Sequence, residues 1–166
     1  FRPFGTRIVG YDPYLPSGHE KALGYERTST LEDLLGQSDI VSIHCPLSAE
    51  TQAMVNADFI SSMKPHSILI NSARGQLIQS TDLIYDALKS NTLWGVGLDV
   101  LPHEPPRNDR LFQAWREQPS WLEGRLIINP HTAYYSEQAW VEMRQKTAET
   151  AALFLRGGTL RNQITV

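Results

Sequence analysis

The sequence predicts an α/β fold built on a doubly wound parallel sheet. Short apolar segments alternate with segments of helical periodicity along the 166 residues, a pattern typical of parallel strands joined by right-handed crossovers. Ile68–Ile70 is apolar at consecutive positions, as expected of a strand that is buried on both faces of such a sheet. A polar or ionisable residue follows each apolar segment, so these residues are expected at the carboxyl ends of the strands.

Five strands are expected, and a proline follows several of them. Pro13, Pro46 and Pro130 each come directly after such a segment, and proline has no N–H to donate to the ladder of a sheet. The expected strands are Thr6–Asp12, Asp39–Cys45, Ser67–Ala73, Gly95–Val100 and Leu126–Pro130.

Helices are expected between the strands. Thr30 is a typical N-cap, with Asp33 three residues later, and Thr81–Lys89 places its apolar residues on one face. The expected helices are one turn at His19–Leu23, a helix that begins at Thr30, and then Asn56–Met63, Thr81–Lys89, Asp109–Arg116 and Ser136–Leu155. Gly157 and Gly158 end the last helix. The segments expected to be irregular are the rest of Pro16–Thr28, Pro102–Glu123 outside its short helix, and an extended tail, Leu160–Val166.

Composition places the chain among ordinary globular proteins. Hydrophobic residues make up 41% and charged residues 20% of the sequence. The net charge of -3 gives no indication of a nucleic-acid or membrane-surface partner, and no apolar run approaches the roughly 20 residues of a membrane span. The single cysteine, Cys45, excludes an internal disulfide, so a reducing compartment such as the cytoplasm is the expected location.

The residues that follow the strands define a candidate binding crevice. The carboxyl ends of parallel strands meet at one edge of a sheet, where open α/β sheets bind their ligands. The residues expected along that edge are Asp12, His44, Ser72, Arg74, Asp99 and His131.

Arg74 is a candidate ligand for a carboxylate. Its planar guanidinium can donate two parallel hydrogen bonds to a planar acid. An arginine that caps the loop or pairs with a surface acid is an equally good interpretation of this residue alone.

Asp12 has two interpretations. In a dinucleotide fold, an acid at this point accepts hydrogen bonds from the adenosine ribose, whereas an NADP site more often has a basic group there. An aspartate before Pro13 is also a common turn former, and taken alone the residue favours the turn.

His131 and Glu104 are candidates for proton transfer. A carboxylate that bonds to an imidazole fixes its tautomer and raises its pKa, which suits a proton donor near neutral pH. A lone histidine is most often structural, but the position of His131 on the same edge as Arg74 favours the functional interpretation. The hydride would then pass to or from a nicotinamide.

Other reactive residues carry weaker indications. Cys45 beside His44 suggests a nucleophile, yet cysteine is most often buried and Pro46 indicates a loop wall. The five histidines show no metal-ligand spacing. His103 is expected to be a solvated loop residue, and the tryptophans at 115 and 121 are expected to pack.

The ordered set of motifs resembles the NAD-binding domain, Rossmann-like in fold, of the D-isomer-specific 2-hydroxyacid dehydrogenases. The resemblance covers essentially the whole chain. Its motifs are Tyr11–Pro13, His44–Leu47, Asn71–Gly75, Gly97–Val100 with Glu104–Pro105, and Asn129–Ala133. A second set is similar to the branch that contains the C-terminal-binding proteins, which are NAD(H)-dependent transcriptional corepressors: Tyr11–Leu15, Ala133–Gln138 and Glu142–Arg144.

The resemblance implies a role for each matching residue. Arg74 would bind the substrate carboxylate, and Glu104 and His131 would form the proton relay. Asp99 would meet the nicotinamide carboxamide, and Asp12 the adenosine ribose. The cofactor cleft would also include Pro13, His44, Cys45, Pro46, Thr51, Ser72, Ala73, Arg74, His131 and Ala133. Tyr134 stands where the corepressors carry a tryptophan, so the substrate pocket is expected to differ there.

Two functions follow from the resemblance. The leading one is an NAD-dependent oxidoreductase of D-2-hydroxy or 2-oxo acids, a homodimer that binds a small acid, no nucleic acid directly and no membrane. The alternative is an NAD(H)-sensing corepressor-like protein, which could be nuclear and would dimerise on cofactor binding; the triad Arg74, Glu104 and His131 serves both. A third interpretation is a non-catalytic remnant that folds or dimerises without ligand.

The resemblance also predicts the domain organisation. Residues 1–152 would form the NAD-binding domain without its first strand and glycine-rich loop, which would precede Phe1. Residues 153–166 would return toward a substrate domain. We therefore expect an N-terminally truncated chain that alone binds NAD poorly and turns over nothing.

Overall fold

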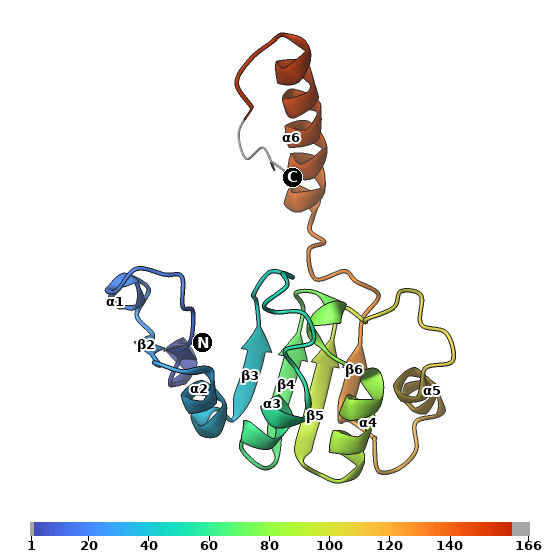
Figure 1. Ribbon diagram of the computed structural model, residues 1–166. Coiled ribbons are helices and arrows are strands. Elements are labelled where there is room, and N and C mark those ends of the chain that lie inside the picture. The colour runs from blue at the N-terminus through green and yellow to red at the C-terminus, as the bar shows by residue number, and fades with distance from the viewer. Residues whose placement is uncertain (1, 161–166) are drawn as a thin grey trace. The chain divides into compact units, whose positions relative to one another are not determined.

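A computed structural model describes residues 2–160 (Figure 1). The chain divides into two compact units, Phe1–Pro130 and His131–Val166. Most of the tail expected at Leu160–Val166 lies outside the described residues.

The first unit contains two parallel sheets. A small sheet pairs β1 with β2, and a larger one has the strand order β3-β4-β5-β6. All pairings between these strands are parallel. The strands are β1 (Val9–Gly10), β2 (Glu26–Arg27), β3 (Ile40–Ile43), β4 (Ser67–Asn71), β5 (Leu93–Leu98) and β6 (Leu126–Ile128). The predicted parallel α/β architecture is confirmed.

The prediction of five strands in one sheet is wrong in two respects: β1 belongs to a separate sheet, and its partner there, β2, lies within the segment expected as loop. Its two residues are both polar and give no apolar run that could indicate a strand. Backbone hydrogen bonds form it: the N–H of Glu26 donates to the carbonyl of Ile8 at 2.9 Å, and that of Thr28 donates to Gly10 at 3.0 Å. Gly10 also leaves room for the Tyr25 ring, which a Cβ at this position would approach to 2.8 Å.

The helices occur where the sequence predicts them. They are α1 (His19–Leu23), α2 (Leu31–Gln37), α3 (Ala57–Ser62), α4 (Thr81–Lys89), α5 (Arg110–Glu117) and α6 (Glu137–Leu155), with short 3₁₀ helices η1 (Arg2–Phe4) and η2 (Gly75–Leu77). The side chain of Thr30 accepts the N–H of Asp33 at 3.1 Å, as predicted. Asn56, Ser80, Asp109 and Ser136 cap α3, α4, α5 and α6 in the same way.

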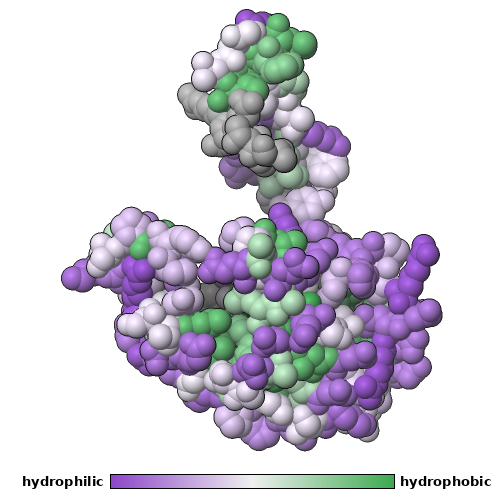
Figure 2. All heavy atoms as spheres, viewed as in Figure 1, coloured by the Kyte–Doolittle hydropathy of each residue, from purple (hydrophilic) through white to green (hydrophobic). Residues whose placement is uncertain are grey.

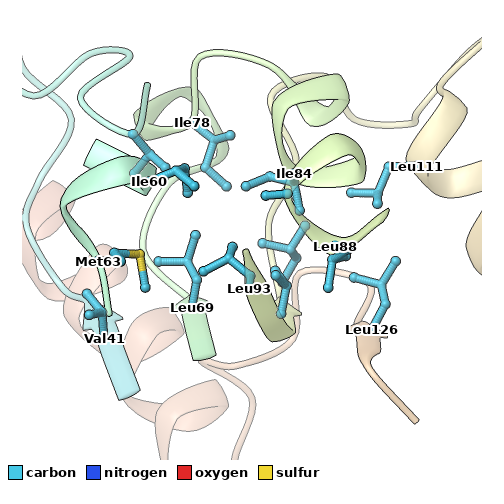
Figure 3. Packing of buried hydrophobic residues seen from close by; sticks show 14 of the residues in the cluster. Val41, Ile60, Met63, Leu69, Ile78, Ile84, Leu88, Leu93, Leu111 and Leu126 are labelled. Atoms are coloured by element: carbon cyan, nitrogen blue, oxygen red, sulfur yellow. The ribbon is translucent and has the colours of Figure 1, made fainter. Parts of the chain in front are cut away.

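The core lies between the larger sheet and its helices. In Figure 1, α3 and α4 cover one face of the sheet. Figure 3 shows Leu69 and Leu93 of the strands pointing toward Ile84 and Leu88 of α4, and all four side chains have 0% exposure. Each such burial contributes roughly 1.5–3 kcal/mol. The outer surface in the view of Figure 2 is mostly hydrophilic, with hydrophobic residues gathered near the centre of the larger unit.

In the second unit, α6 is a single helix with no buried side chain. Gly157, with φ 70, follows its end as the sequence predicts, and the N–H of Gly157 donates to the carbonyl of Phe154 at 3.0 Å. Among the described helices, α6 included, none has the length and apolar character to cross a membrane.

Arg125, just before β6, links β5 and the preceding loop to α4. Its guanidinium donates to the carbonyl oxygens of Trp94 at 2.7 Å, Leu93 at 2.8 Å, Trp121 at 2.8 Å and Leu88 near the end of α4 at 3.0 Å. A cation at a helix C-terminus also interacts favourably with the helix dipole. One side chain therefore satisfies carbonyl groups of three segments.

We expect Arg125→Ala to lower the free energy of unfolding by about 2 kcal/mol, because four carbonyl groups lose a charged donor. Urea denaturation followed by far-ultraviolet circular dichroism measures the change. Arg125→Lys should restore only part of the loss, since an ammonium lacks the planar fork. The exposed Arg107 is the control, and Arg107→Ala should change stability by less than about 0.5 kcal/mol. Equal stabilities of the Arg125→Ala and Arg107→Ala variants would contradict the assignment.

Candidate functional site at the strand ends

The register of the larger sheet brings its strand ends into one row. Ile43 of β3 pairs with Asn71 of β4, Asn71 with Leu98 of β5, and Leu98 with Ile128 of β6. The next residues along the four strands therefore start from the same edge: His44, Ser72, Asp99 and Asn129. The predicted edge is present for the ends of β3 to β6, but Asp12 follows a strand of the smaller sheet and His131 belongs to the second unit.

Asp12 follows β1, the strand of the smaller sheet, and lies in a turn. Its Oδ1 accepts the N–H of Tyr14 at 2.9 Å. The prediction that Asp12 forms a turn is therefore confirmed. The structure records no hydrogen bond to Oδ2 from the described residues. That oxygen is available to accept a bond from a ligand hydroxyl.

Arg27 supports this turn from β2. Its guanidinium donates to the carbonyl of Asp12 at 2.8 Å and to that of Leu15 at 2.9 Å. The sequence gives no indication of this role of Arg27, because its contact with Asp12 spans 15 residues and no local pattern encodes it.

Cys45 follows β3 and is half-buried. Burial raises the pKa of the Cys45 thiol, and the carboxylate of Asp12 raises it further. The thiol donates to the sulfur of Met54 at 3.6 Å. A half-buried thiol with a raised pKa is a weak nucleophile, in line with the interpretation of this segment as a loop wall.

The loop after β3 is held by its own side chains. Thr51 Oγ1 donates to the carbonyl of Pro46 at 2.6 Å and accepts the N–H of Ser48 at 2.8 Å. The hydroxyl of Tyr14 donates to the carboxylate of Glu50, and this bond raises the pKa of Tyr14. The loop is thereby joined to the turn that carries Asp12.

Arg74 lies in the loop after β4 and is exposed. Its Nη1 donates to the carbonyl of Ala73 at 2.6 Å. Among the described residues, the structure records no partner for its Nε or Nη2. Two donors of the guanidinium fork are therefore available for an acid.

Asp99 and Glu104 follow β5. Asp99 is buried, with 6% exposure, and its N–H donates to the carbonyl of Asn71 at 3.0 Å. Oε1 of Glu104 accepts the N–H of Leu101 at 2.8 Å, and the Glu104–Pro105 peptide bond is cis. Asp99 and Glu104 thus lie on the loop adjacent to the one that carries Arg74.

His131 is the first residue of the second unit. Its backbone has φ 56, in the left-handed region that few residues other than glycine adopt. Its ring meets that of Tyr134 edge to face, with centroids 6.4 Å apart. The structure therefore groups Arg74, Asp99 and Glu104 in the first unit, whereas His131, Ala133 and Tyr134 belong to the second.

Two residues that sequence reasoning did not assign to the site shape the Arg74 loop. The side chain of Asn71 bonds to the next residues of the loop, and a Cβ on Gly75 would clash with the carbonyl of Leu101. An asparagine at a strand end is a known turn former, so a local signal for Asn71 existed. The close approach at Gly75 is a tertiary contact without such a signal.

The histidines, cysteine and acids of the described segment form no cluster of three that could hold a metal. The site instead fits a dinucleotide. It combines the row of strand ends with an acid, Asp12, that follows β1 of the smaller sheet. Asp12 offers an acceptor for a ribose, and Arg74, in the loop after β4, offers free donors. Fold and site together define a dinucleotide-binding α/β domain.

Comparison with known proteins identifies the family. Residues 1–133 match the family described as "D-isomer specific 2-hydroxyacid dehydrogenase, NAD binding domain". The chain belongs to this family, and NAD is the cofactor of the domain.

The similar proteins are larger than this chain. D-lactate dehydrogenase of Streptococcus pyogenes serotype M1 is 31% identical over 174 residues, which cover 99% of this chain and 50% of that protein. C-terminal-binding protein 1 of Caenorhabditis elegans is 33% identical over 161 residues, 94% of this chain and 20% of that protein. The crystal structure of Aquifex aeolicus D-lactate dehydrogenase complexed with NAD and lactic acid has a TM-score of 0.78 and 31% identity, over 94% of this chain and 48% of that one. The chain thus spans about half the length of the lactate dehydrogenases.

We expect Cys45 to react slowly with iodoacetamide. Its pKa is raised by burial and by Asp12, and only the thiolate reacts, so the rate should reach its midpoint above the value of about 8.5 for a free cysteine. Mass spectrometry of alkylated Cys45 at a series of pH values measures this midpoint, with glutathione as the reference thiol. Asp12→Asn should move the midpoint down, because a negative charge is removed. A midpoint at or below that of glutathione would overturn the prediction.

Proposed function

We propose that the protein with this chain is an NAD-dependent oxidoreductase that transfers hydride at the CH–OH carbon of a small D-2-hydroxy acid or the carbonyl of its 2-oxo acid. The observation that carries the proposal is the position of Arg74 beyond β4, with two guanidinium donors available, beside the loop of Glu104. Membership of the dehydrogenase family supports it. The proposal includes the substrate class and the roles of individual residues.

The cofactor would lie along the row of strand ends. Asp12 would accept hydrogen bonds from the adenosine ribose through its Oδ2, and Asp99 would meet the carboxamide of the nicotinamide. The residues proposed to line the rest of the cleft are Pro13, His44, Cys45, Pro46, Thr51, Ser72, Ala73 and Ala133. When bound, NAD supplies the carbon that accepts or gives up the hydride.

The chain's own residues would handle charge and protons. Arg74 would grip the substrate carboxylate through Nε and Nη2 and so orient the reacting carbon. His131 would give a proton to the forming hydroxyl, or take it in the reverse direction. Glu104 would hold the imidazole of His131 in the tautomer that this transfer needs.

The substrate proposed here is a small acid. The related Aquifex enzyme was crystallised with lactic acid, which makes pyruvate a suitable first probe for the reverse reaction. Tyr134, whose ring contacts that of His131, is the proposed pocket wall that limits the size of the substrate side chain.

The match to C-terminal-binding protein 1, 33% identical, supports a second candidate. In this case the chain senses NAD(H) and pairs with a second copy when the cofactor binds. Light scattering coupled to size-exclusion chromatography, with and without NADH, would detect such pairing. Turnover of a 2-oxo acid is the result that separates the enzyme from a sensor without activity.

We expect Arg74→Ala to raise KM for pyruvate about a hundredfold, because the carboxylate loses a charged double donor. We expect His131→Ala to lower kcat by about a hundredfold or more, the usual contribution of a general acid or base. Oxidation of NADH, followed at 340 nm, measures both effects. Arg116→Ala and His19→Ala change exposed residues and serve as controls. Wild-type kinetics in the Arg74→Ala variant would refute the carboxylate assignment.

We expect Asp12→Ala to weaken NADH binding about tenfold and to narrow the preference for NADH over NADPH. The variant loses an acceptor for the ribose and also a charge that repels a 2′-phosphate. Fluorescence titration with each nucleotide gives the two Kd values. Asp58→Ala, at an exposed acid on α3, should leave both unchanged. An unaltered Kd ratio in Asp12→Ala would exclude Asp12 from the adenosine site.

A further inference from the structure

The side chain of Asn71 makes two hydrogen bonds with the backbone of the loop that carries Arg74. Asn71 is the last residue of β4 and has 0% exposure. Its Oδ1 accepts the N–H of Ala73 at 3.0 Å, and its Nδ2 donates to the carbonyl of Arg74 at 2.9 Å. One buried carboxamide therefore fixes the backbone on both sides of the Ala73–Arg74 peptide bond.

The chemistry of this contact requires an amide. The loop presents one donor and one acceptor to the same side chain, and a carboxamide offers an acceptor and a donor in one plane. An ionised carboxylate accepts only, and leucine, of similar size, can do neither. Because the site is buried, a backbone group that loses its partner there costs free energy.

The next residue joins the Arg74 loop to the Glu104 loop. A Cβ on Gly75 would clash with the carbonyl carbon and oxygen of Leu101, so the two backbones touch. The N–H of Leu101 in turn donates to the carboxylate of Glu104 at 2.8 Å. A displacement of the Arg74 loop would therefore be transmitted to the loop that holds Glu104.

We propose that Asn71 is a positioning residue for Arg74, which sets the site of the substrate carboxylate relative to Glu104 without touching the substrate. The proposal rests on the proposed function, since it assigns Arg74 to the carboxylate. The structure supports it by the two hydrogen bonds from one fully buried side chain and by the backbone contact at Gly75. Asn71 acts at the point where the strand ends and the loop begins.

The test uses Asn71→Leu and Asn71→Asp in the complete protein, with pyruvate and NADH as probes. Asn71→Leu should raise KM for pyruvate at least about tenfold, because the guanidinium is displaced, and should raise it by a larger factor than the Kd for NADH. Leu69→Ala opens a cavity in the same strand and controls for lost stability. It should lower Tm without raising KM for pyruvate.

The pH profile distinguishes positioning from a merely structural role. In Asn71→Asp, the new carboxyl regains a donor only when it is protonated, and burial raises the pKa of such a group. The KM for pyruvate, relative to wild type, should therefore recover as the pH falls from about 8 to about 5.5. Asn71→Leu should show no recovery over the same range.

Hydrogen exchange at the amide of Ala73 gives a readout that needs no turnover. This amide should exchange faster in Asn71→Leu than in wild type or Leu69→Ala, because its acceptor is lost. Wild-type exchange at Ala73 together with a wild-type KM in Asn71→Leu would overturn the proposal. A wild-type protein that oxidises no NADH with pyruvate or other 2-oxo acids would instead count against the proposed function, and the exchange at Ala73 would still decide whether Asn71 holds the loop.

Discussion

Parallel pairing in a fixed register is the constraint on which the site depends. Every strand from β3 to β6 runs in the same direction, so each connection must return across the sheet, and all four carboxyl ends meet at one edge. The pairing continues one residue beyond the strands, because the N–H of Asp99 bonds to the carbonyl of Asn71 and that of Asn129 to Leu98. A slip of one residue would turn each side chain to the opposite face. The core and the row of candidate residues therefore depend on the same register.

The sequence was most informative where structure is local. The cap at Thr30 and the apolar face of Thr81–Lys89 depend on spacings of three and four residues, and both are present in the structure. β5 begins at Leu93, before the predicted start at Gly95, because two apolar residues ahead of a glycine are too short a run to indicate a strand. β2 also gives no signal in the sequence, because its two residues are polar and its pairing partner, β1, lies far away along the chain.

The same distinction, between local patterns and contacts of distant segments, applies to the candidate site. The sequence predicts Arg74 and Asp99 at the edge where the structure has them, because the end of an apolar segment is enough to indicate the end of a strand. The contributions of Arg27 and Gly75 are contacts between distant segments, and no pattern within either segment encodes them. Asn71 belongs partly to each group. The sequence indicates its tendency to form a turn, but its second hydrogen bond, to the carbonyl of Arg74, depends on the folded loop.

The polar anchors of the fold are mostly groups that do not titrate near neutral pH. Arg125 bonds through a guanidinium and Asn71 through a neutral carboxamide. The caps of α2, α3, α4 and α6 are hydroxyls or an amide, and only α5, among the capped helices described, relies on a carboxylate, Asp109. The framework around the strand ends should thus hold its shape through the range in which a histidine changes charge. A change of activity in that range would report proton transfer at the site rather than loosening of the scaffold.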